Sequence, residues 1–319
     1  MIYHSSRQSS LLLSAPASIG RNLSAEKVSL HFLFGYHGVM TSRTEDKNRP
    51  FPAVEAVFFD VDGTLYDHAA GGIPDLHMKA MKDLQGQGIK VCLCSGRCMP
   101  LLENLGILDL FPFDGVVAGN GSYVYGEKGR LIYADPVDPR AAADIFRLAA
   151  AQNIPVFAAG NRVLVTEMTD GVRDLFERIS VQNIPVRNPL PDDTFAVLSL
   201  VEENRRLHPE FAVPGIRLLE NELSMDMMKD DLSKYEGIRR LLDYYGLSSY
   251  MAFGDALNDL EMLEHADVGV AMGNAQKELL ERIPEVCPPV TESGIYVWLK
   301  DHGFLSVASK EPPTGGSLQ

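Results

Sequence analysis

Short apolar runs alternate with stretches of helical periodicity along most of the chain. The runs at 54–59 (VEAVFF) and 90–94 (KVCLC) are uninterrupted and rich in β-forming residues, as expected for strands covered on both faces. Between them, residues 74–88 place apolar side chains near one face and end in glycines, which predicts a helix and its C-terminal stop. Residues 114–119 predict a third strand. Strand, helix and strand in this order indicate right-handed βαβ units and a parallel sheet.

The same alternation returns near the C-terminus, whereas the middle of the chain has a different pattern. The C-terminal part predicts strands at 250–255 and 268–273 and helices at 233–247, 259–266, 275–283 and 294–304. The middle predicts two helices, at 139–153 and 172–180, among alternating runs typical of hairpins at 155–167, 194–203 and 216–227. The prediction is therefore an α/β fold. A Rossmann-like, doubly wound parallel sheet is formed by 51–135 and 228–306, with an α+β module inserted at 136–227.

Both ends of the chain have a composition unlike the rest. Residues 1–50 are rich in serine and lack acids until Glu26, and a short apolar stretch there is a poor match to a signal peptide. A weak export or transit signal is one interpretation; a disordered extension, with the true start at Met40, is the favoured one. Residues 307–319 are predicted to be a disordered tail. No stretch approaches the ~18 apolar residues that a membrane span needs.

The overall composition is that of a globular protein in water, with 45% hydrophobic and 23% charged residues. Lys and Arg total 29 against 43 Asp and Glu, so the net charge is −14. Phosphate contacts to nucleic acid need clustered Lys and Arg, and this balance disfavours such a partner. The four cysteines form no CxxC pair and no zinc-ligand spacing. They are expected to be reduced and packed, which favours a cytoplasmic location.

The stretch FFDVDGTLYD at 58–67 places carboxylates directly behind a buried apolar run. Such carboxylates repel one another and are costly to desolvate, so a positive partner is expected beside them. Ligands of open α/β sheets bind beyond the carboxyl ends of the strands. Asp60 and Asp62 follow the first strand, Ser95 the second and Asp255 a later one, which brings them to one edge of the sheet. Clustered carboxylates at this edge suit Mg²⁺ together with substrate phosphate oxygens.

These residues lie in four short motifs: DVDGTLYD, SGR, the lysine of LSKYEG, and GDALNDLEML. The motifs, their order and the position of the insert resemble the haloacid dehalogenase superfamily, in its Cof-type branch of phosphatases with a large cap between motifs two and three. The resemblance covers about residues 54 to 305. It implies a Mg²⁺-dependent phosphatase that acts on a small phosphorylated metabolite, such as a sugar phosphate, through an aspartyl-phosphate. No membrane partner is expected, because the chain has no stretch long and apolar enough to span a bilayer.

The resemblance also implies a role for each matching position. Asp60 is the nucleophile, and Asp62 is the general acid and then the general base. Ser95 and Lys234 bind the phosphoryl group. Thr64 occupies the family's turn position after Asp60 and Asp62, where it orients this pair and is counted with the phosphate-binding residues. The expected metal ligands are the Asp60 side chain, the Asp62 backbone carbonyl and the Asp255 side chain. The residues expected to support these groups are Asn258, Asp259 and Arg97.

Other interpretations compete with these roles. Asp60 could cap a turn, Ser95 and Asn258 could cap helices, and Lys234 could be a solvated helix residue. For Arg97, binding of substrate or phosphate and pairing with a nearby acid are equally expected. His68 and His77 are expected at the surface or between domains.

The chain departs from the family pattern at Tyr235, where a glycine is usual, and in the GNGS stretch at 119–122, where NGA is common. Neither departure touches the expected nucleophile or metal carboxylates. A phosphomutase or phosphotransferase with the same intermediate, and a binding protein without turnover, remain alternative functions.

Overall fold

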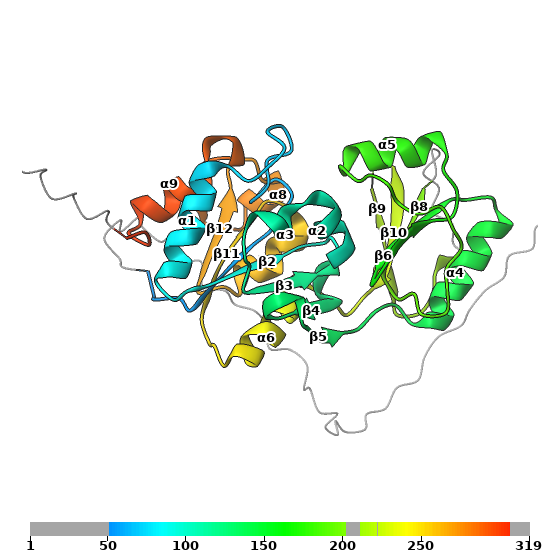
Figure 1. The fold of residues 1–319 in the computed structure, drawn as a ribbon, viewed down its shortest axis with the longest axis horizontal. Helices are drawn as coiled ribbons and strands as arrows, with labels where there is room; N and C mark the ends of the chain where they lie inside the picture. Colours follow the sequence, from blue (N-terminus) through cyan, green and yellow to red (C-terminus); the bar gives the residue numbers. More distant parts are fainter. Residues whose placement is uncertain (1–50, 202–210, 222, 307–319) are drawn as a thin grey trace, which may run out of the picture. The chain divides into compact units, whose positions relative to one another are not determined.

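A computed structural model describes residues 51–201, 211–221 and 223–306. The predictions for the serine-rich segment 1–50 and for the tail 307–319 lie outside these residues. The described part contains two β-sheets and the helices that cover them (Figure 1).

The larger sheet has eight strands in the order β13-β12-β11-β1-β2-β3-β4-β5. The strands are β1 (Ala56–Phe59), β2 (Lys90–Cys94), β3 (Gly115–Ala118), β4 (Tyr123–Tyr125), β5 (Leu131–Ala134), β11 (Tyr250–Gly254), β12 (Val268–Met272) and β13 (Glu285–Cys287). All neighbours from β13 to β3 are parallel, and β4 and β5 add an antiparallel edge. The predicted parallel α/β sheet is confirmed. The β4–β5 hairpin was not predicted.

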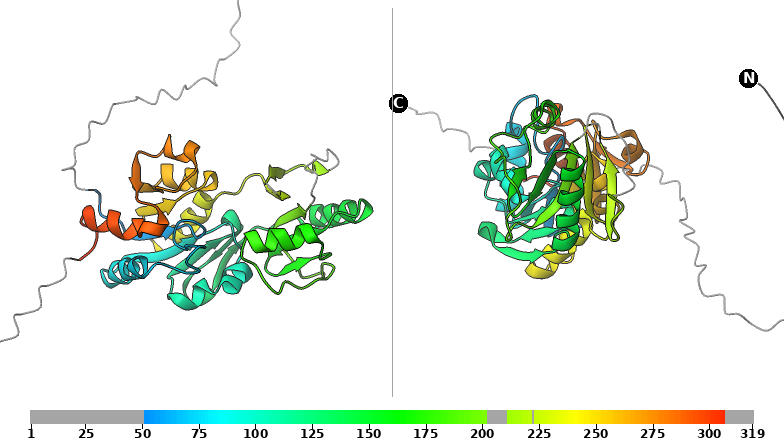
Figure 2. Two further views of the ribbon diagram at one scale, coloured as in Figure 1. Left: turned by 90° about the horizontal axis from the view of Figure 1, so that it is seen from above. Right: turned by 90° about the vertical axis from the view of Figure 1, so that its right-hand side faces the viewer.

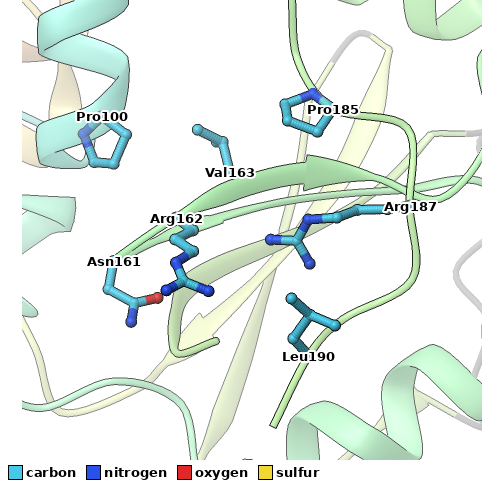
Figure 3. A pocket seen from close by; sticks show the side chains of 7 residues that line it. All are labelled: Pro100, Asn161, Arg162, Val163, Pro185, Arg187 and Leu190. Carbon is cyan, nitrogen blue, oxygen red and sulfur yellow. The ribbon is translucent and has the colours of Figure 1, made fainter. Parts of the chain in front are cut away.

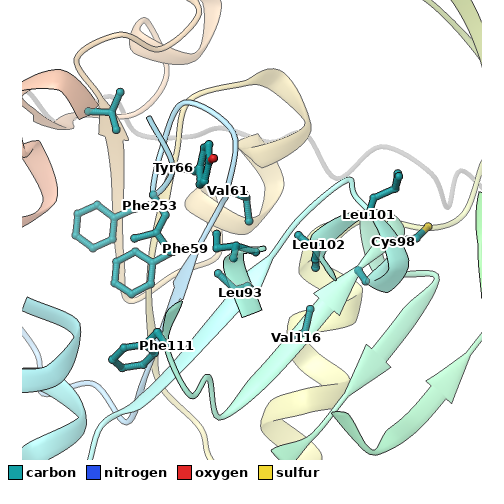
Figure 4. Close-up of a cluster of buried hydrophobic side chains, with 14 of the residues drawn as sticks. Phe59, Val61, Tyr66, Leu93, Cys98, Leu101, Leu102, Phe111, Val116 and Phe253 are labelled. Atoms are coloured by element: carbon teal, nitrogen blue, oxygen red, sulfur yellow. The ribbon is translucent and has the colours of Figure 1, made fainter. Parts of the chain in front are cut away.

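Helices cover both faces of this sheet, as a doubly wound fold requires. Helices α1 (Asp75–Gly86), α2 (Met99–Leu105), α3 (Ile107–Leu110) and α9 (Gly294–Asp301) cover one face, to which β1 contributes Val57 and Phe59. Figure 4 shows Phe59 within this cluster. Helices α6 (Lys234–Tyr245), α7 (Leu260–Glu264) and α8 (Lys277–Leu280) cover the other face, to which β1 contributes Ala56 and Phe58. The residues of β1 therefore alternate between two buried clusters. Helix α9 lies beside α1 (Figures 1 and 2).

The smaller sheet is antiparallel, in the order β7-β6-β8-β10-β9. Its strands are β6 (Val156–Gly160), β7 (Val163–Val165), β8 (Phe195–Val201), β9 (Ile216–Glu220) and β10 (Ser224–Lys229). Helix α4 (Pro139–Ala151) packs on one face. Helix α5 (Asp170–Arg178) packs on the other, where the rings of Phe157 and Phe176 are 5.1 Å apart. All of these elements lie in the inserted segment apart from the end of β10, so we call them the cap; the domain boundaries stay a prediction.

The C-terminal helices are shorter than the sequence predicts. The helix expected at 259–266 begins with a 3₁₀ turn, Leu257–Asp259, and continues as α7. The helix expected at 275–283 is regular only over α8, which spans Lys277–Leu280. Further 3₁₀ turns span Gly119–Gly121, Glu127–Gly129 and Val290–Glu292. Within the described ranges, no helix combines the length and the hydropathy needed to cross a bilayer.

Candidate functional site

Three neighbouring strands of the larger sheet deliver polar residues to one edge. Strand β1 lies between β11 and β2, and each strand is followed directly by a polar residue: Asp60, Asp255 and Ser95 respectively. Asp60 and Ser95 are buried. Gly63 allows the chain to turn after β1 because its φ is +82°, and a Cβ there would lie 2.5 Å from Asp255 Oδ2. The turn and the end of β11 therefore pack closely against each other.

Lys234 reaches this edge from the first residue of α6. The hydroxyl of Ser233 caps the helix by accepting a hydrogen bond from the Glu236 N–H at 3.3 Å. The lysine side chain is almost fully buried, and its Nζ donates to Asp60 Oδ1 and to Asp259 Oδ1, both at 2.5 Å. Burial opposes the charged form, but the two carboxylates outweigh it and raise the pKa of Lys234. Its ammonium group is therefore held charged between two carboxylates.

Asp60, Asp255 and Asp259 form the acidic cluster of the site. One carboxylate oxygen from each lies within 4.8 Å of the other two. The second oxygen of Asp259 accepts hydrogen bonds from the N–H groups of Asp255 and Ala256, both at 3.0 Å, which fixes its direction. Thr64 Oγ1 lies 3.3 Å from Asp255 Oδ1 and donates to it. Thr64 therefore orients the carboxylate of Asp255, whereas the resemblance implied that it orients Asp60 and Asp62 and contacts the phosphate.

The positive charge beside the cluster does not balance its three carboxylates. Burial, and then the neighbouring Asp259, raise the pKa of Asp255 to about 6 and that of Asp60 well above its ordinary value. Lys234 is the ammonium group in contact with the cluster and offsets only part of this charge. Oxygen ligands at this spacing are those that a hard divalent cation prefers, and such a cation would remove the repulsion. The donor set therefore fits a divalent metal.

The carboxylate of Asp62 has partners outside this cluster. Its carboxylate accepts two hydrogen bonds from Arg97, from Nε at 2.8 Å and from Nη2 at 2.7 Å, and its Oδ1 lies 2.6 Å from His68 Nε2. Although burial acts in the opposite direction, these partners hold the pKa of Asp62 well below its usual range. Of the two interpretations of Arg97, the structure therefore shows an ion pair with an acid.

Arg97 and His68 also connect Asp62 to the cap. The Arg97 Nη2 donates to the Ile179 carbonyl at 2.7 Å, and His68 Nδ1 lies 3.2 Å from Ser180 Oγ. Ile179 and Ser180 directly follow α5, so the two side chains that hold the expected general acid also contact the segment after this cap helix. The expectation of an interdomain position is met for His68. For His77 it is wrong, because this side chain is fully buried in the core.

The GNGS departure forms the turn beside Ser95. Asn120 has φ +53°, and its N–H donates to the Ser95 carbonyl at 3.1 Å. Its side-chain Oδ1 accepts a hydrogen bond from Asn258 Nδ2 at 3.1 Å, which links this turn to the loop after β11. The Ser95 hydroxyl accepts the Arg97 N–H at 3.1 Å, so it also caps the turn that leads to α2.

The sequence did not predict a functional role for three residues of the site: His68, Asn120 and Asn274. Asn274 donates from Nδ2 to the Gly63 carbonyl at 2.8 Å, and this nitrogen lies 3.5 Å from Asp255 Oδ2. It follows the end of β12, so the strand-end rule that selected Asp60 and Asp255 could have found it. His68 carries no such signal, because only the folded loop brings its ring to Asp62.

A separate open pocket lies on the cap beside Pro100 of α2 (Figure 3). Its volume is about 450 Å³, and its lining includes Arg162 and Arg187. Arg187 donates to both oxygens of Asp193, and Arg162 lies 3.6 Å from the same carboxylate. Both guanidinium groups are thus paired within the cap, and no residue of the acidic cluster lines this pocket.

Comparisons with known proteins agree with the geometry. The family described as haloacid dehalogenase-like hydrolase matches residues 57–299. The chain is 33% identical over 264 residues to the protein named "Putative phosphatase YkrA" of Bacillus subtilis (strain 168), covering 78% of this chain and 98% of that one.

Two crystal structures share the fold. One is a hypothetical protein from Geobacillus kaustophilus HTA426, with a TM-score of 0.72 and 27% identity over 79% of this chain and 100% of the other. The second is BT1666 from Bacteroides thetaiotaomicron, from a study of phosphatases of the superfamily, with a TM-score of 0.68 and 26% identity over 79% of this chain and 96% of the other. The resemblance carried by the four motifs is confirmed: the chain belongs to the haloacid dehalogenase-like hydrolases, in their Cof-type branch.

Proposed function

We propose that this chain is a Mg²⁺-dependent phosphatase that hydrolyses a small phosphorylated metabolite through a phosphorylated Asp60. Membership of the hydrolase family and the likeness to a phosphatase-named relative support the class of enzyme. One observation carries the proposed mechanism. A buried carboxylate at the end of β1 lies 2.5 Å from a buried lysine and within 4.8 Å of two further carboxylates.

We infer the following reaction from these groups and from the roles that the family resemblance implies for them. Asp60 attacks phosphorus, the bond to the leaving oxygen breaks, and Asp62 supplies the proton that this oxygen takes up. Asp62, now ionised, accepts a proton from the water that attacks the phosphorus of the aspartyl-phosphate. Phosphate then leaves, and the carboxylate of Asp60 is regenerated. The Lys234 ammonium and the Ser95 hydroxyl would hold the phosphoryl oxygens, on which charge accumulates in the transition state.

The two catalytic aspartates need opposite protonation states at the start. Asp60 must be ionised, and Asp60 and Asp255 would hold a divalent cation together with the Asp62 carbonyl, with Asn258 and Asp259 in support. When bound, this ion supplies the positive charge that stabilises the Asp60 carboxylate and the transferring phosphoryl group. Asp62 must be protonated, whereas Arg97 and His68 favour its charged form. A substrate phosphate next to Asp62 raises the pKa of this carboxylate and so promotes its protonation.

We further propose that the protein acts in the cytoplasm on sugar phosphates or similar monoesters. The location rests on the four cysteines, which are all buried and unpaired. The substrate class rests on the family and on the cap, whose segment after α5 contacts the residues that hold Asp62. A cap in this position can exclude water during transfer and contact the leaving group.

The experiment is phosphate release from a panel of phosphomonoesters, with and without Mg²⁺, by the wild type and by Asp60→Asn. This substitution keeps the shape of the side chain and removes the attacking carboxylate. We expect Mg²⁺-dependent release by the wild type and a loss of at least about a thousandfold in the variant, because covalent catalysis needs the nucleophile. Release that persists in Asp60→Asn would refute the mechanism. Products in which phosphate has moved to a sugar would identify a phosphomutase or phosphotransferase.

A further inference from the structure

One face of the cap sheet carries polar side chains where α5 does not cover it. Two rows of paired residues cross this face. Phe157, Ser199, Asp226 and Leu219 form one row, and Ala159, Val197, Met228 and Arg217 form the next. The β6 end of these rows belongs to the apolar cluster that includes α5, whereas Leu219 and Arg217 on the edge strand β9 are exposed. The opposite face is apolar and packs against α4.

Three consecutive contacts connect Arg217 to the edge of the larger sheet that carries the acidic cluster. Arg217 Nη2 lies 3.2 Å from Met228 Sδ, and Met228 Sδ lies 4.0 Å from Asn120 Nδ2. Asn120 in turn accepts a hydrogen bond from Asn258, the neighbour of Asp259, at 3.1 Å. Met228 is buried between these groups. The guanidinium group is therefore connected through the side chains of Met228 and Asn120 to the loop after β11.

The charges on this face leave the Arg217 guanidinium available. Asp226, the acid in the adjacent row, already accepts hydrogen bonds from Ser199, Ser224 and Asn221. Among residues 51–201, 211–221 and 223–306, no carboxylate lies within ion-pair distance of Arg217. A guanidinium group stays charged and presents five donors in a plane, a geometry that matches a carboxylate or a phosphate. In a chain of net charge −14, such a group attracts an anion.

We propose that Arg217 determines specificity by binding a second anionic group, a carboxylate or a phosphate, on the leaving group of the substrate. The proposal rests on the proposed function and narrows its substrate class to phosphomonoesters that carry such a group. The phosphoryl group to be transferred lies at Asp60, and the second anion lies at the edge strand of the cap. The Met228 sulfur contacts both the guanidinium group and the Asn120 amide.

The test compares kcat/KM for a hexose phosphate, the matching phosphorylated sugar acid and the matching hexose bisphosphate. The enzymes are the wild type, Arg217→Met, Arg217→Lys and a matched control, Arg147→Met. Arg147 is an exposed arginine of α4, which covers the opposite face, and it pairs with Asp144 on its own helix. Hydrolysis of p-nitrophenyl phosphate, which has no second anion, reports on the catalytic groups alone. Melting temperatures confirm that the variants are folded.

The wild type is expected to prefer at least one of the two substrates with an extra anion. Arg217→Met is expected to lower the ratio of kcat/KM for that substrate over the hexose phosphate by about 10- to 100-fold, mainly through KM, because a charge-assisted pair is lost. The ratio for Arg217→Lys should lie between those of the wild type and Arg217→Met. Arg147→Met should leave the ratio unchanged. A loss on the phosphorylated sugar acid would identify the second anion as a carboxylate, and a loss on the hexose bisphosphate would identify it as a phosphate.

Two results would overturn this assignment. One is a wild type without preference for either anionic substrate, and the other is an equal loss on all substrates in Arg217→Met, which would indicate a structural role on the edge strand. A wild type that releases no phosphate even from p-nitrophenyl phosphate would instead refute the proposed function itself.

Discussion

The single residues of the site divide into those that a strand end identifies and those that only the fold brings together. Asp60, Ser95 and Asp255 follow β1, β2 and β11, so the parallel sheet alone predicts that they meet. The direction of the Asp62 side chain could not be predicted in this way. Asp62 is three residues beyond the end of β1, and its carboxylate binds Arg97 and His68, which are 35 and six residues away along the chain. These pairings form only in the folded protein and cannot be predicted from the local sequence.

The buried position of His77 also could not be predicted from the local sequence, and it leads to a prediction for stability in acid. The ring is fully buried, and its Nε2 accepts a hydrogen bond from the Ile295 N–H of α9 at 3.3 Å. Burial lowers its pKa from 6.5 to about 4. Between about pH 6.5 and pH 4, the unfolded chain therefore binds a proton at His77, whereas the folded chain does not. The full stability contribution is present above about pH 6.5 and is lost as the pH falls toward 4, amounting to about 3 kcal/mol.

Urea unfolding of the wild type and of His77→Gln across this pH range measures the effect. Glutamine can still accept the Ile295 N–H but does not titrate there. We expect the free energy of unfolding of the wild type to fall more steeply with acid than that of the variant. Identical pH dependence in the two proteins would show that His77 does not titrate as its burial requires.

At the level of elements, the long periodic segments were predicted well, whereas the β4–β5 hairpin was not. The helices expected at 74–88, 139–153 and 233–247 are α1, α4 and α6, because each has a complete apolar face to bury. The β4–β5 hairpin was missed because its two strands are three and four residues long, too short for a period to be evident. The start of α6 was predicted from its serine cap, and that start places Lys234 at the site.

The position of α6 also depends on a close approach that the GNGS stretch makes possible. Gly121 has φ +95°, and a Cβ there would lie 2.2 Å from the Ser233 carbonyl oxygen, just before Lys234. Gly121→Ala is therefore expected to destabilise the protein by about 2 kcal/mol or more and to lower kcat, because α6 must move away.

The matched control is Gly86→Ala at the end of α1, where a Cβ would meet no atom within 4 Å. This change should not reduce stability, since alanine favours a helix. Urea unfolding and phosphate release on both variants decide the matter. A Gly121→Ala protein with unchanged kcat would show that α6 does not need this approach to position Lys234.

For the whole molecule, the class of fold was predictable but the order of the strands was not. Alternating strands and helices predict a parallel sheet wherever they occur, and a change of pattern marks the insert. The register of β1 with β11 pairs Ala56 with Tyr250, across the entire cap, and no local pattern specifies such a partner. The same holds for the acidic cluster, which joins residues from both sides of the insert. The motifs supplied this long-range information through the family that they resemble.

The central claim is that the phosphoryl group passes through Asp60, and one measurement tests it most directly. The wild type is mixed with excess substrate and Mg²⁺, quenched in acid within the first turnovers, digested, and examined by mass spectrometry. We predict that the peptide containing Asp60 carries the added mass of one phosphoryl group, that hydroxylamine removes it, and that Asp60→Asn lacks it. Turnover of substrate without any phosphorylated Asp60 peptide, or with the group on another residue, would contradict the account.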